Sequence, residues 1–254
     1  METGIGLTFP EDHHFHGTQI EWVYLWGKFS NGQFFHFANF AMNVGPFHER
    51  AIHSSIFNGE VRYSEEVSDQ FNELKGFLRY FKLIQETWAV NTDELSITLH
   101  PQSKPVAHKV SEGRNYYSIP YLVGEGMIYP DEKVTVEAWL DHEFSIIKSF
   151  RGWDWVSVKL SEGPWIMAYK SDADSFCTVG MGESHCYSDF SIDGEFLHVE
   201  KTGSFLRLKP IYKETIFHPK FGVPYSEQPF YAISRGKVVG HGMRERAYKE
   251  KSNG

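Results

Sequence analysis

The sequence predicts an all-β protein built from two barrel-like halves, and three observations lead to this fold class. Aromatic residues make up 16% of the 254-residue chain, a share that favours strands. Short alternating or aromatic segments recur along the chain with turn residues between them. These segments form two sets of roughly seven or eight, which predicts one β-barrel over residues 1–130 and a second over residues 131–254.

The first half is expected to begin with a hairpin, because Asn31-Gly32 separates two aromatic segments. Its strands are predicted over residues 19–26, 33–40, 51–57, 77–83, 87–90 and 95–100. One short helix is predicted over residues 65–75, where Val67, Phe71 and Leu74 recur at spacings of four and three.

The second half is expected to begin after Pro130-Asp131. Its strands are predicted over residues 133–144, 153–160, 165–169, 176–179, 195–201, 205–210 and 231–239, with turns or bulges at 161–163, 193–194 and 235–236. No low-complexity linker marks the join, so we expect the halves to be packed together, with a ligand between them.

Charge and composition exclude several classes of partner. The formal charge is −8 and basic residues are not clustered, so we expect no nucleic acid. No apolar run approaches the ~18 residues of a membrane span, and residues 1–10 show no targeting pattern, which predicts a cytoplasmic protein. The two cysteines, Cys177 and Cys186, are expected to be thiols, although they could face each other across a hairpin.

Two groups near the N-terminus carry ionisable side chains. Alternation places Glu21 on an otherwise apolar strand face, where it is either paired with a partner such as an arginine or lines a site. His13, His14 and His16 suggest a metal site at first sight, but the sequence offers no third ligand at metal spacing. We expect no bound metal and a capping or turn role for this tract.

The segment from Trp139 to Phe144 places two carboxylates, Asp141 and Glu143, on one face of a strand. Such a pair is either a structural network with an arginine such as Arg151 or Arg246, or an acid/base device with a raised pKa. His142 lies on the opposite face, either as a satisfied core histidine or as a proton shuttle.

A second aromatic and acidic segment follows at Gly152-Trp153-Asp154-Trp155. An indole wall beside an acid suits polyenes and carbocations, although two core tryptophans fit the pattern equally well. No nucleophile elbow and no glycine-rich phosphate loop occurs. The chemistry that remains needs no cofactor.

Taken together, these motifs resemble the carotenoid 1,2-hydratase-like (AttH-like) lipocalin-related family. The resemblance is carried in order along nearly the whole chain by residues 10–14, Glu21-Trp22-Val23-Tyr24, Tyr117-Ser118, residues 139–144, residues 152–155 and residues 240–245. It implies two tandem lipocalin-like β-barrels and chemistry without a cofactor. Activities in that family include alkene hydration and Diels-Alder cyclisation in natural-product biosynthesis, part of secondary metabolism.

The resemblance also implies a set of site residues. Hydratases of the family place His-x-Trp and then Tyr-x-Asp in the second half, and here His142 and Tyr169 match while Phe144 and Ser171 replace the tryptophan and the acid. The expected catalytic residues are His142, Tyr169, Asp141, Glu143 and Asp154. The expected substrate-binding residues are Glu21, Trp22, Tyr24, Phe35, Phe37, Phe144, Trp153, Trp155, Trp165 and Ser171.

The missing hydratase acid favours a cofactor-free cyclase or isomerase of the pericyclic type (a pericyclase), acting on an apolar polyene, polyketide or terpenoid. Two alternatives stay open. One is an acid-initiated hydratase (hydro-lyase) or cyclase that uses Asp141, Glu143 or Asp154, and the other is a non-catalytic carrier of an apolar ligand. The expected partner is an apolar small molecule, and the sequence does not define the oligomeric state.

Overall fold

The described part of the chain is almost entirely β-structure. The computed structural model describes residues 20–44, 47–68, 81–84, 87–108, 110–145, 152–172, 174–181, 183–218 and 223–247. Within these ranges the one helical segment is a 3-10 turn, Glu200–Thr202. No helix in the same ranges is long and apolar enough to cross a bilayer. The all-β fold class is therefore confirmed.

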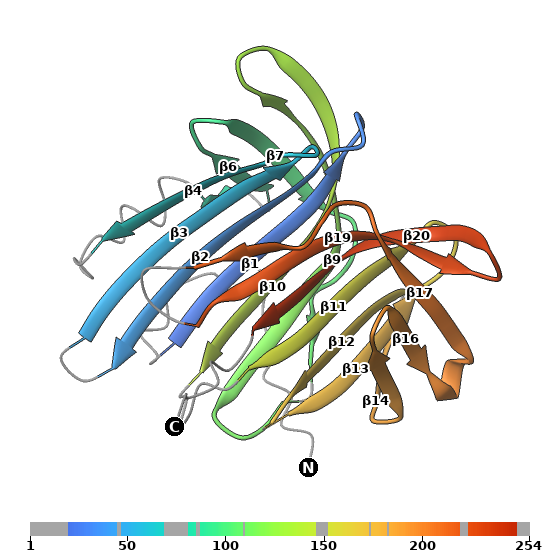
Figure 1. Cartoon of the computed structure of the whole chain (residues 1–254). Coiled ribbons are helices and arrows are strands. Elements are labelled where there is room, and N and C mark those ends of the chain that lie inside the picture. The colour runs from blue at the N-terminus through green and yellow to red at the C-terminus, as the bar shows by residue number, and fades with distance from the viewer. Residues whose placement is uncertain are drawn as a thin grey trace. The chain divides into compact units, whose positions relative to one another are not determined.

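The first sheet contains ten antiparallel strands in the order β4-β3-β2-β1-β10-β9-β7-β6-β5, with β8 added beside β9 (Figure 1). Its strands are β1 (Ile20–Phe29), β2 (Phe34–Val44), β3 (Phe47–Phe57), β4 (Val61–Ser68), β5 (Phe81–Ile84), β6 (Thr87–Asn91), β7 (Leu95–Pro101), β8 (Val106–Ala107), β9 (Arg114–Ile128) and β10 (Glu132–Ser145). β1 and β2 form the expected hairpin around Asn31-Gly32, with a positive φ of 91° at Gly32.

The second sheet repeats this topology, in the order β14-β13-β12-β11-β20-β19-β17-β16-β15, with β18 beside β19. Its strands are β11 (Trp153–Leu160), β12 (Trp165–Ser171), β13 (Ser175–Met181), β14 (Glu183–Tyr187), β15 (Phe190–Asp193), β16 (Phe196–Val199), β17 (Ser204–Pro210), β18 (Thr215–Phe217), β19 (Tyr225–Ser234) and β20 (Lys237–Ala247). Every strand has a counterpart ten places earlier, so the two sheets are tandem copies of one fold.

The division between the two units lies later than the sequence suggested. β10, which was assigned to the second half, pairs with β1 along its length and with β9 on its other side. The first unit therefore extends to Ile147, and the second is formed mainly by residues 148–254 with the short segments 59–61 and 108–112. The expected boundary at residue 130 falls within one sheet, because Pro130 belongs to the turn that joins β9 to β10.

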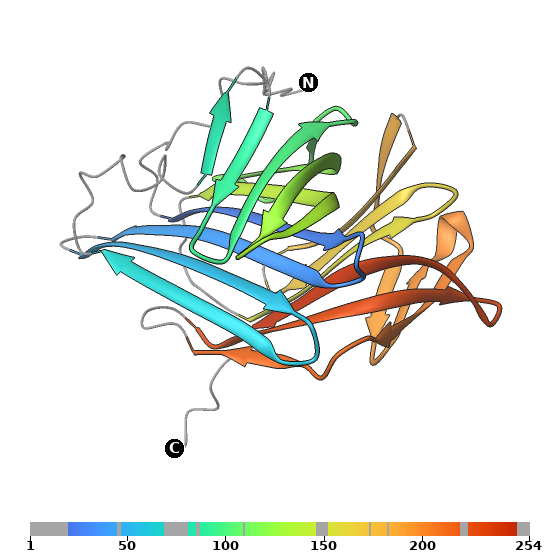
Figure 2. The same ribbon diagram turned by 90° about the horizontal axis from the view of Figure 1, so that it is seen from above.

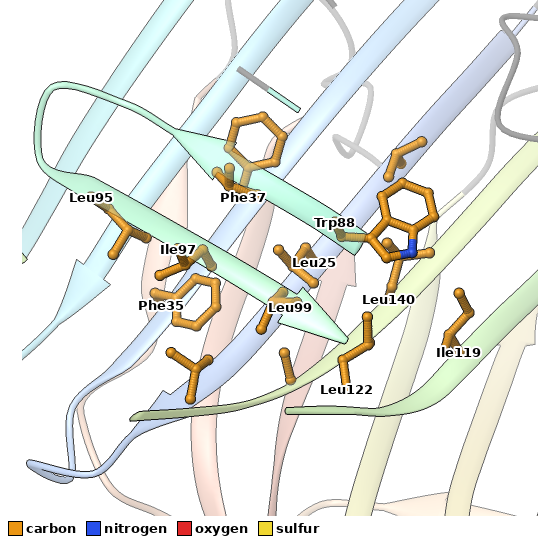
Figure 3. Close-up of a cluster of buried hydrophobic side chains, with 14 of the residues drawn as sticks. Leu25, Phe35, Phe37, Trp88, Leu95, Ile97, Leu99, Ile119, Leu122 and Leu140 are labelled. Carbon is orange, nitrogen blue, oxygen red and sulfur yellow. The ribbon is translucent and has the colours of Figure 1, made fainter. Parts of the chain in front are cut away.

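The first sheet curls around an apolar core. In Figure 2 the strands β5–β7 turn back over β1–β4, and Figure 3 shows Leu95, Ile97 and Leu99 of β7 packed over side chains of β1 and β2. Trp88, Phe35 and Leu25 belong to the same cluster and are at most 1% exposed. The side chains of opposite walls thus close the barrel, as expected for a small lipocalin-like barrel with a filled interior.

The second sheet encloses a smaller core of its own. The cluster contains valine, isoleucine and leucine from β11, β12, β16 and β17, together with Phe230 of β19. Gly242 of β20 lies where a Cβ would collide with the Ser157 carbonyl and the Phe230 ring. The glycine therefore permits β20 to pack closely against β11 and β19.

Several predicted elements need correction. The longest strand of the first sheet, β9, was not predicted, because Pro120, Gly124 and Gly126 argue against a strand. A Cβ at Gly124 would collide with the Thr98 backbone, so this glycine is required by close strand pairing. The predicted helix over 65–75 is wrong at its start, since β4 continues to Ser68, and the rest of that range lies outside the described residues.

Candidate functional site

Three buried polar side chains form a hydrogen-bonded chain inside the first barrel. His142 of β10 lies at its centre, with Nε2 2.9 Å from Oε1 of Glu21 on β1. Its other ring nitrogen, Nδ1, lies 2.8 Å from the hydroxyl of Tyr117 on β9. His142 and Tyr117 are 1% exposed and Glu21 is 3% exposed. The chain therefore joins a carboxyl, an imidazole and a phenol away from bulk solvent.

Strand pairing explains why these three residues meet. In register, His142 stands opposite Val23 of β1 on one side and opposite Tyr117 of β9 on the other. Directly opposed residues of antiparallel strands point to the same face, and Val23 and Leu140 place this face toward the core. Glu21 is two residues before Val23, in the last inward-facing row of the β1–β10 pairing. The chain thus lies near one end of the barrel.

The surroundings of the chain are aromatic and apolar. The His142 ring lies 5.1 Å from the Tyr117 ring and 5.3 Å from the Phe144 ring, measured between centroids. Phe35 and Phe37 of β2 also face inward and are at most 1% exposed. Elsewhere in this interior a cavity of about 10 Å³, the size of one water molecule, is lined by Phe37, Ser54, Ile56, Val90 and Leu95 and by no residue of the hydrogen-bonded chain. The structure therefore brings together Glu21, His142 and Phe144 of the expected site, while Phe35 and Phe37 face the same interior farther along the barrel, opposite Gly27 and Leu25 of β1.

The protonation state of His142 decides what this chain can do. A neutral ring has one donor and one acceptor nitrogen, so it can donate to Glu21 while accepting from Tyr117. A protonated ring donates from both nitrogens, which leaves the Tyr117 hydroxyl hydrogen to donate elsewhere. The arrangement has the parts of an acid/base relay, because a carboxylate stabilises the imidazolium.

Asp141 lies on the opposite face of β10 and is held by three donors. Its carboxylate accepts from Trp139 Nε1 at 2.7 Å, from the Tyr116 hydroxyl at 3.0 Å and from the Ser118 hydroxyl. Burial raises the pKa of Asp141 to about 7, and the nearby Glu143 adds to this, although the three hydrogen bonds lower it. This carboxyl can therefore carry a proton at neutral pH.

Glu143, the second acid of the pair, is neutralised by an arginine. Arg114 of β9 donates from Nε and Nη2 to its two carboxylate oxygens, both at 2.7 Å. Glu143 is fully buried, and the Arg114 side chain is 11% exposed. The expected arginine partner thus exists, but it is neither of the two suggested by the sequence. Arg246 instead pairs with Glu214 at 2.5 Å, and Arg151 lies outside the described residues.

The second barrel has an ion pair at the positions that correspond to Glu21 and His142. Val156 of β11 stands opposite Arg244 of β20, as Val23 stands opposite His142. Arg244 donates to both carboxylate oxygens of Asp154, at 2.8 and 2.5 Å, and also to the Gly194 carbonyl. An acid–base pair at this point is therefore common to both barrels. In the first barrel the base is histidine, whose ring, unlike the guanidinium of arginine, can be neutral and can then accept as well as donate a hydrogen bond.

The remaining predicted residues lie on other faces. Trp22 and Tyr24 share the outward face of the first sheet with Asp141, and Tyr24 is stacked on His36 with a centroid distance of 6.0 Å. In the second unit Trp153, Trp155, Tyr169 and Ser171 lie on the face opposite Asp154, and Trp165 lies on this face of β12 with them.

Within that face Tyr169 stacks on Phe176, with centroids 5.3 Å apart. His108 lies beside Phe176 and its Nδ1 is 2.9 Å from the Thr178 hydroxyl, while burial lowers its pKa to about 3. Ser171 accepts from the Asp174 amide in the turn after β12, and the Asp174 carboxylate accepts from Ser111. The Asp174 side chain and amide are thus both engaged in this turn.

The cysteines and histidine tract can be placed in part. Cys177 and Cys186 are both free thiols, because Cys186 stands opposite Thr178 and the two cysteines therefore point to opposite faces of the β13–β14 hairpin. His13, His14 and His16 lie outside the described residues. In the described ranges no group of three or more His, Cys, Asp or Glu is arranged to hold a metal ion.

Sequence reasoning missed most partners of the segment from Trp139 to Phe144. Arg114, Tyr116 and Tyr117 all belong to β9, the strand that its glycines and proline concealed. The alternation of Tyr116, Tyr117 and Ser118 was the available signal, because one tyrosine must face each side of such a strand. His108 precedes β9 and carried no local motif.

Comparison with solved structures identifies the fold. An AttH protein from Nitrosomonas europaea, described as putative, superposes with a TM-score of 0.76 and 18% identity, covering 97% of this chain and 98% of that chain. The chain has the AttH-like fold. This result confirms the tandem lipocalin-like barrels that the motifs implied.

Two further structures share the AttH-like fold at lower similarity. Kievitone hydratase from Nectria haematococca gives a TM-score of 0.54 at 13% identity, covering 91% of this chain and 89% of that chain. CghA, solved with Sch210972, gives a TM-score of 0.51 at 11% identity, covering 91% of this chain and 89% of that chain. No family model matches the chain, and no curated protein matches it significantly. At these identities the AttH-like fold is what the comparisons establish.

Proposed function

We propose that the protein is a cofactor-independent cyclase for an apolar substrate with a conjugated carbonyl, and that the Glu21–His142–Tyr117 chain supplies the acid. The observation that carries this proposal is the continuous hydrogen bonding of the three side chains at one end of an aromatic barrel interior. A buried chain of this kind is costly unless it is used or fully paired, and its imidazole can bond at both ring nitrogens.

The chain polarises a carbonyl in the following way. With His142 protonated, Nε2–H donates to Glu21 and Nδ1–H donates to the Tyr117 oxygen. The Tyr117 hydroxyl then donates to the substrate carbonyl oxygen, which draws electron density from the conjugated alkene and lowers the barrier to ring closure. If the proton is fully transferred, the Nδ1 proton moves to the tyrosine oxygen, so Tyr117 is again a phenol and His142 is neutral.

Similarity of fold supports a cyclase or hydratase in general terms. One fold neighbour is named a hydratase and another is a Diels-Alderase, so the AttH-like fold is compatible with both kinds of reaction. The Phe144 ring, 5.3 Å from the His142 ring between centroids, would hold a flexible polyene in a reactive shape beside the chain. Substrate and product would belong to natural-product metabolism.

Tyr117→Phe tests the proposal most selectively, because it removes one hydroxyl and keeps the ring. Linear polyenes with a conjugated carbonyl are first screened for binding by tryptophan fluorescence, and cyclised products are then measured by chiral chromatography. We expect the wild type to change the rate and the product ratio, and Tyr117→Phe to be at least about 100-fold slower with binding retained. An unchanged rate and product ratio on a compound that binds would refute the proposal and indicate a carrier.

The second candidate is an acid-initiated hydratase or cyclase, and the buried position of the Asp141 carboxyl, held by Trp139, Tyr116 and Ser118, is the observation in its favour. A carboxyl whose pKa is raised to about 7 can protonate an alkene near neutral pH. In this reaction a solvent proton ends on carbon, so a product formed in deuterated water carries deuterium at the new centre. Asp141→Asn would then abolish turnover, whereas the first mechanism predicts product without carbon-bound deuterium.

A further inference from the structure

The second unit exposes an apolar surface surrounded by basic residues. Phe196 of β16, Phe205 of β17 and Val238 of β20 are 41%, 55% and 61% exposed, among the most exposed large apolar side chains of the described residues. The Phe196 and Phe205 rings are stacked, with centroids 5.4 Å apart. Exposed aromatic side chains that gather in this way mark a contact surface more often than scattered ones do.

Strand register makes this surface continuous. Phe196 stands opposite Arg207 of β17, Arg207 opposite Ile233 of β19, and Ile233 opposite Val238 of β20. In the next row Phe205 stands opposite His198, with ring centroids 5.8 Å apart. The inward residues of the same strands, Leu206 and Leu208 among them, belong to the core. The row from Phe196 to Val238 therefore crosses four neighbouring strands on the outward face.

The charge of this surface is opposite in sign to that of the chain. Residues 193–209 and 231–241 contain five basic residues, Lys201, Arg207, Lys209, Arg235 and Lys237, against three acidic ones, Asp193, Glu195 and Glu200, of which Asp193 stands opposite Phe196. All five basic residues are exposed. Arg207 is paired with Glu195 at 3.0 Å, and Glu200 precedes Lys201 in the 3-10 turn. A local positive excess on a chain of net charge −8 favours association with an anionic partner.

We propose that this aromatic–basic surface, formed by Phe196, Phe205, Val238 and the five basic residues, binds the surface of an anionic lipid bilayer. Aromatic side chains insert at the level of the headgroups, and lysine and arginine beside them attract anionic lipids. The combination of protruding rings and surrounding positive charge fits this partner on both counts. Binding is peripheral, and it is independent of the reaction proposed for the first barrel.

The test is co-sedimentation of the full chain with vesicles of phosphatidylcholine alone and of phosphatidylcholine with phosphatidylglycerol. The wild type is expected to sediment with the anionic vesicles and to be released by 1 M salt, where the screening length falls to about 3 Å. Arg235→Gln combined with Lys237→Gln should weaken binding about 25-fold, since each basic residue near the membrane contributes about fivefold. Phe196→Ser combined with Phe205→Ser should weaken binding about tenfold or more.

Ile216→Ser is the matched control, because Ile216 is 57% exposed on β18, which pairs with the opposite end of β19. This variant should bind vesicles as the wild type does. Failure of the wild type to bind anionic vesicles would overturn the proposal, as would equal binding by the Phe196/Phe205 variant. Sedimentation equilibrium adds a further outcome: a dimer that the same variant dissociates would assign the surface to a second copy of the chain, which also overturns the proposal.

Discussion

Asp141→Asn should change how stability depends on pH. Burial raises the pKa of Asp141 from 3.8 to about 7 in the folded state. Because the folded pKa exceeds the unfolded one, the protonated carboxyl contributes stability fully below about pH 4, and this contribution is lost as the pH rises through 7. A difference of about three pH units corresponds to about 4 kcal/mol.

The assay is urea unfolding followed by tryptophan fluorescence at pH values from 4 to 8. Asparagine has nearly the same shape as aspartic acid and does not titrate, so the stability of the wild type relative to Asp141→Asn should fall by about 4 kcal/mol across this range. Asp131→Asn, in the exposed turn before β10, is the control and should give a curve parallel to that of the wild type. Parallel curves for Asp141→Asn as well would refute the account of Asp141 as a buried, protonated acid.

Three further variants or treatments test the surrounding structure. Arg114→Met removes the arginine partner of the buried Glu143 carboxylate and should lower the free energy of unfolding in urea by about 3–5 kcal/mol. The double variant Arg114→Met with Glu143→Met should recover most of this loss, and a cost below about 1 kcal/mol for the single variant would contradict the pairing. Gly124→Ala places a Cβ against the Thr98 backbone and should destabilise the first unit by about 3 kcal/mol or more, with a normal unfolding midpoint as the contrary result. A thiol reagent should modify Cys186 in the native protein and Cys177 after unfolding, because burial raises the Cys177 pKa to about 12; rapid reaction of both would be inconsistent with this burial.

Alternation along single strands could be predicted well from the sequence. It placed His142 and Phe144 on one face of β10 and Asp141 and Glu143 on the other, as the register shows. The inward position of Glu21 followed from the same rule. Period-2 patterning reports which face a side chain occupies, because successive Cβ atoms alternate across a strand.

Pairing between distant strands could not be predicted in this way. Glu21 is 121 positions from His142 in the sequence, and no local pattern indicates that β1 and β10 are neighbours. Arg114 was missed, and Tyr117 was noted only as part of a family motif, because Pro120 and two glycines made β9 look like a loop. In the structure Pro120 and Tyr121 lie at the irregularity between Ala138 and Leu140, where the ladder with β10 shifts register.

The most direct test of the central claim is NMR of the His142 ring. Long-range ¹H–¹⁵N spectra of protein labelled with ¹⁵N-histidine show both nitrogens of each ring. Because the chain has 13 histidines, the signals of His142 are assigned by their loss in the variant His142→Gln. The Glu21–His142–Tyr117 chain predicts that Tyr117→Phe shifts the Nδ1 resonance, that Glu21→Gln shifts Nε2, and that Tyr116→Phe, on the opposite face, shifts neither. Ring resonances that stay unchanged in Tyr117→Phe and Glu21→Gln would contradict the chain and the acid/base role proposed for it.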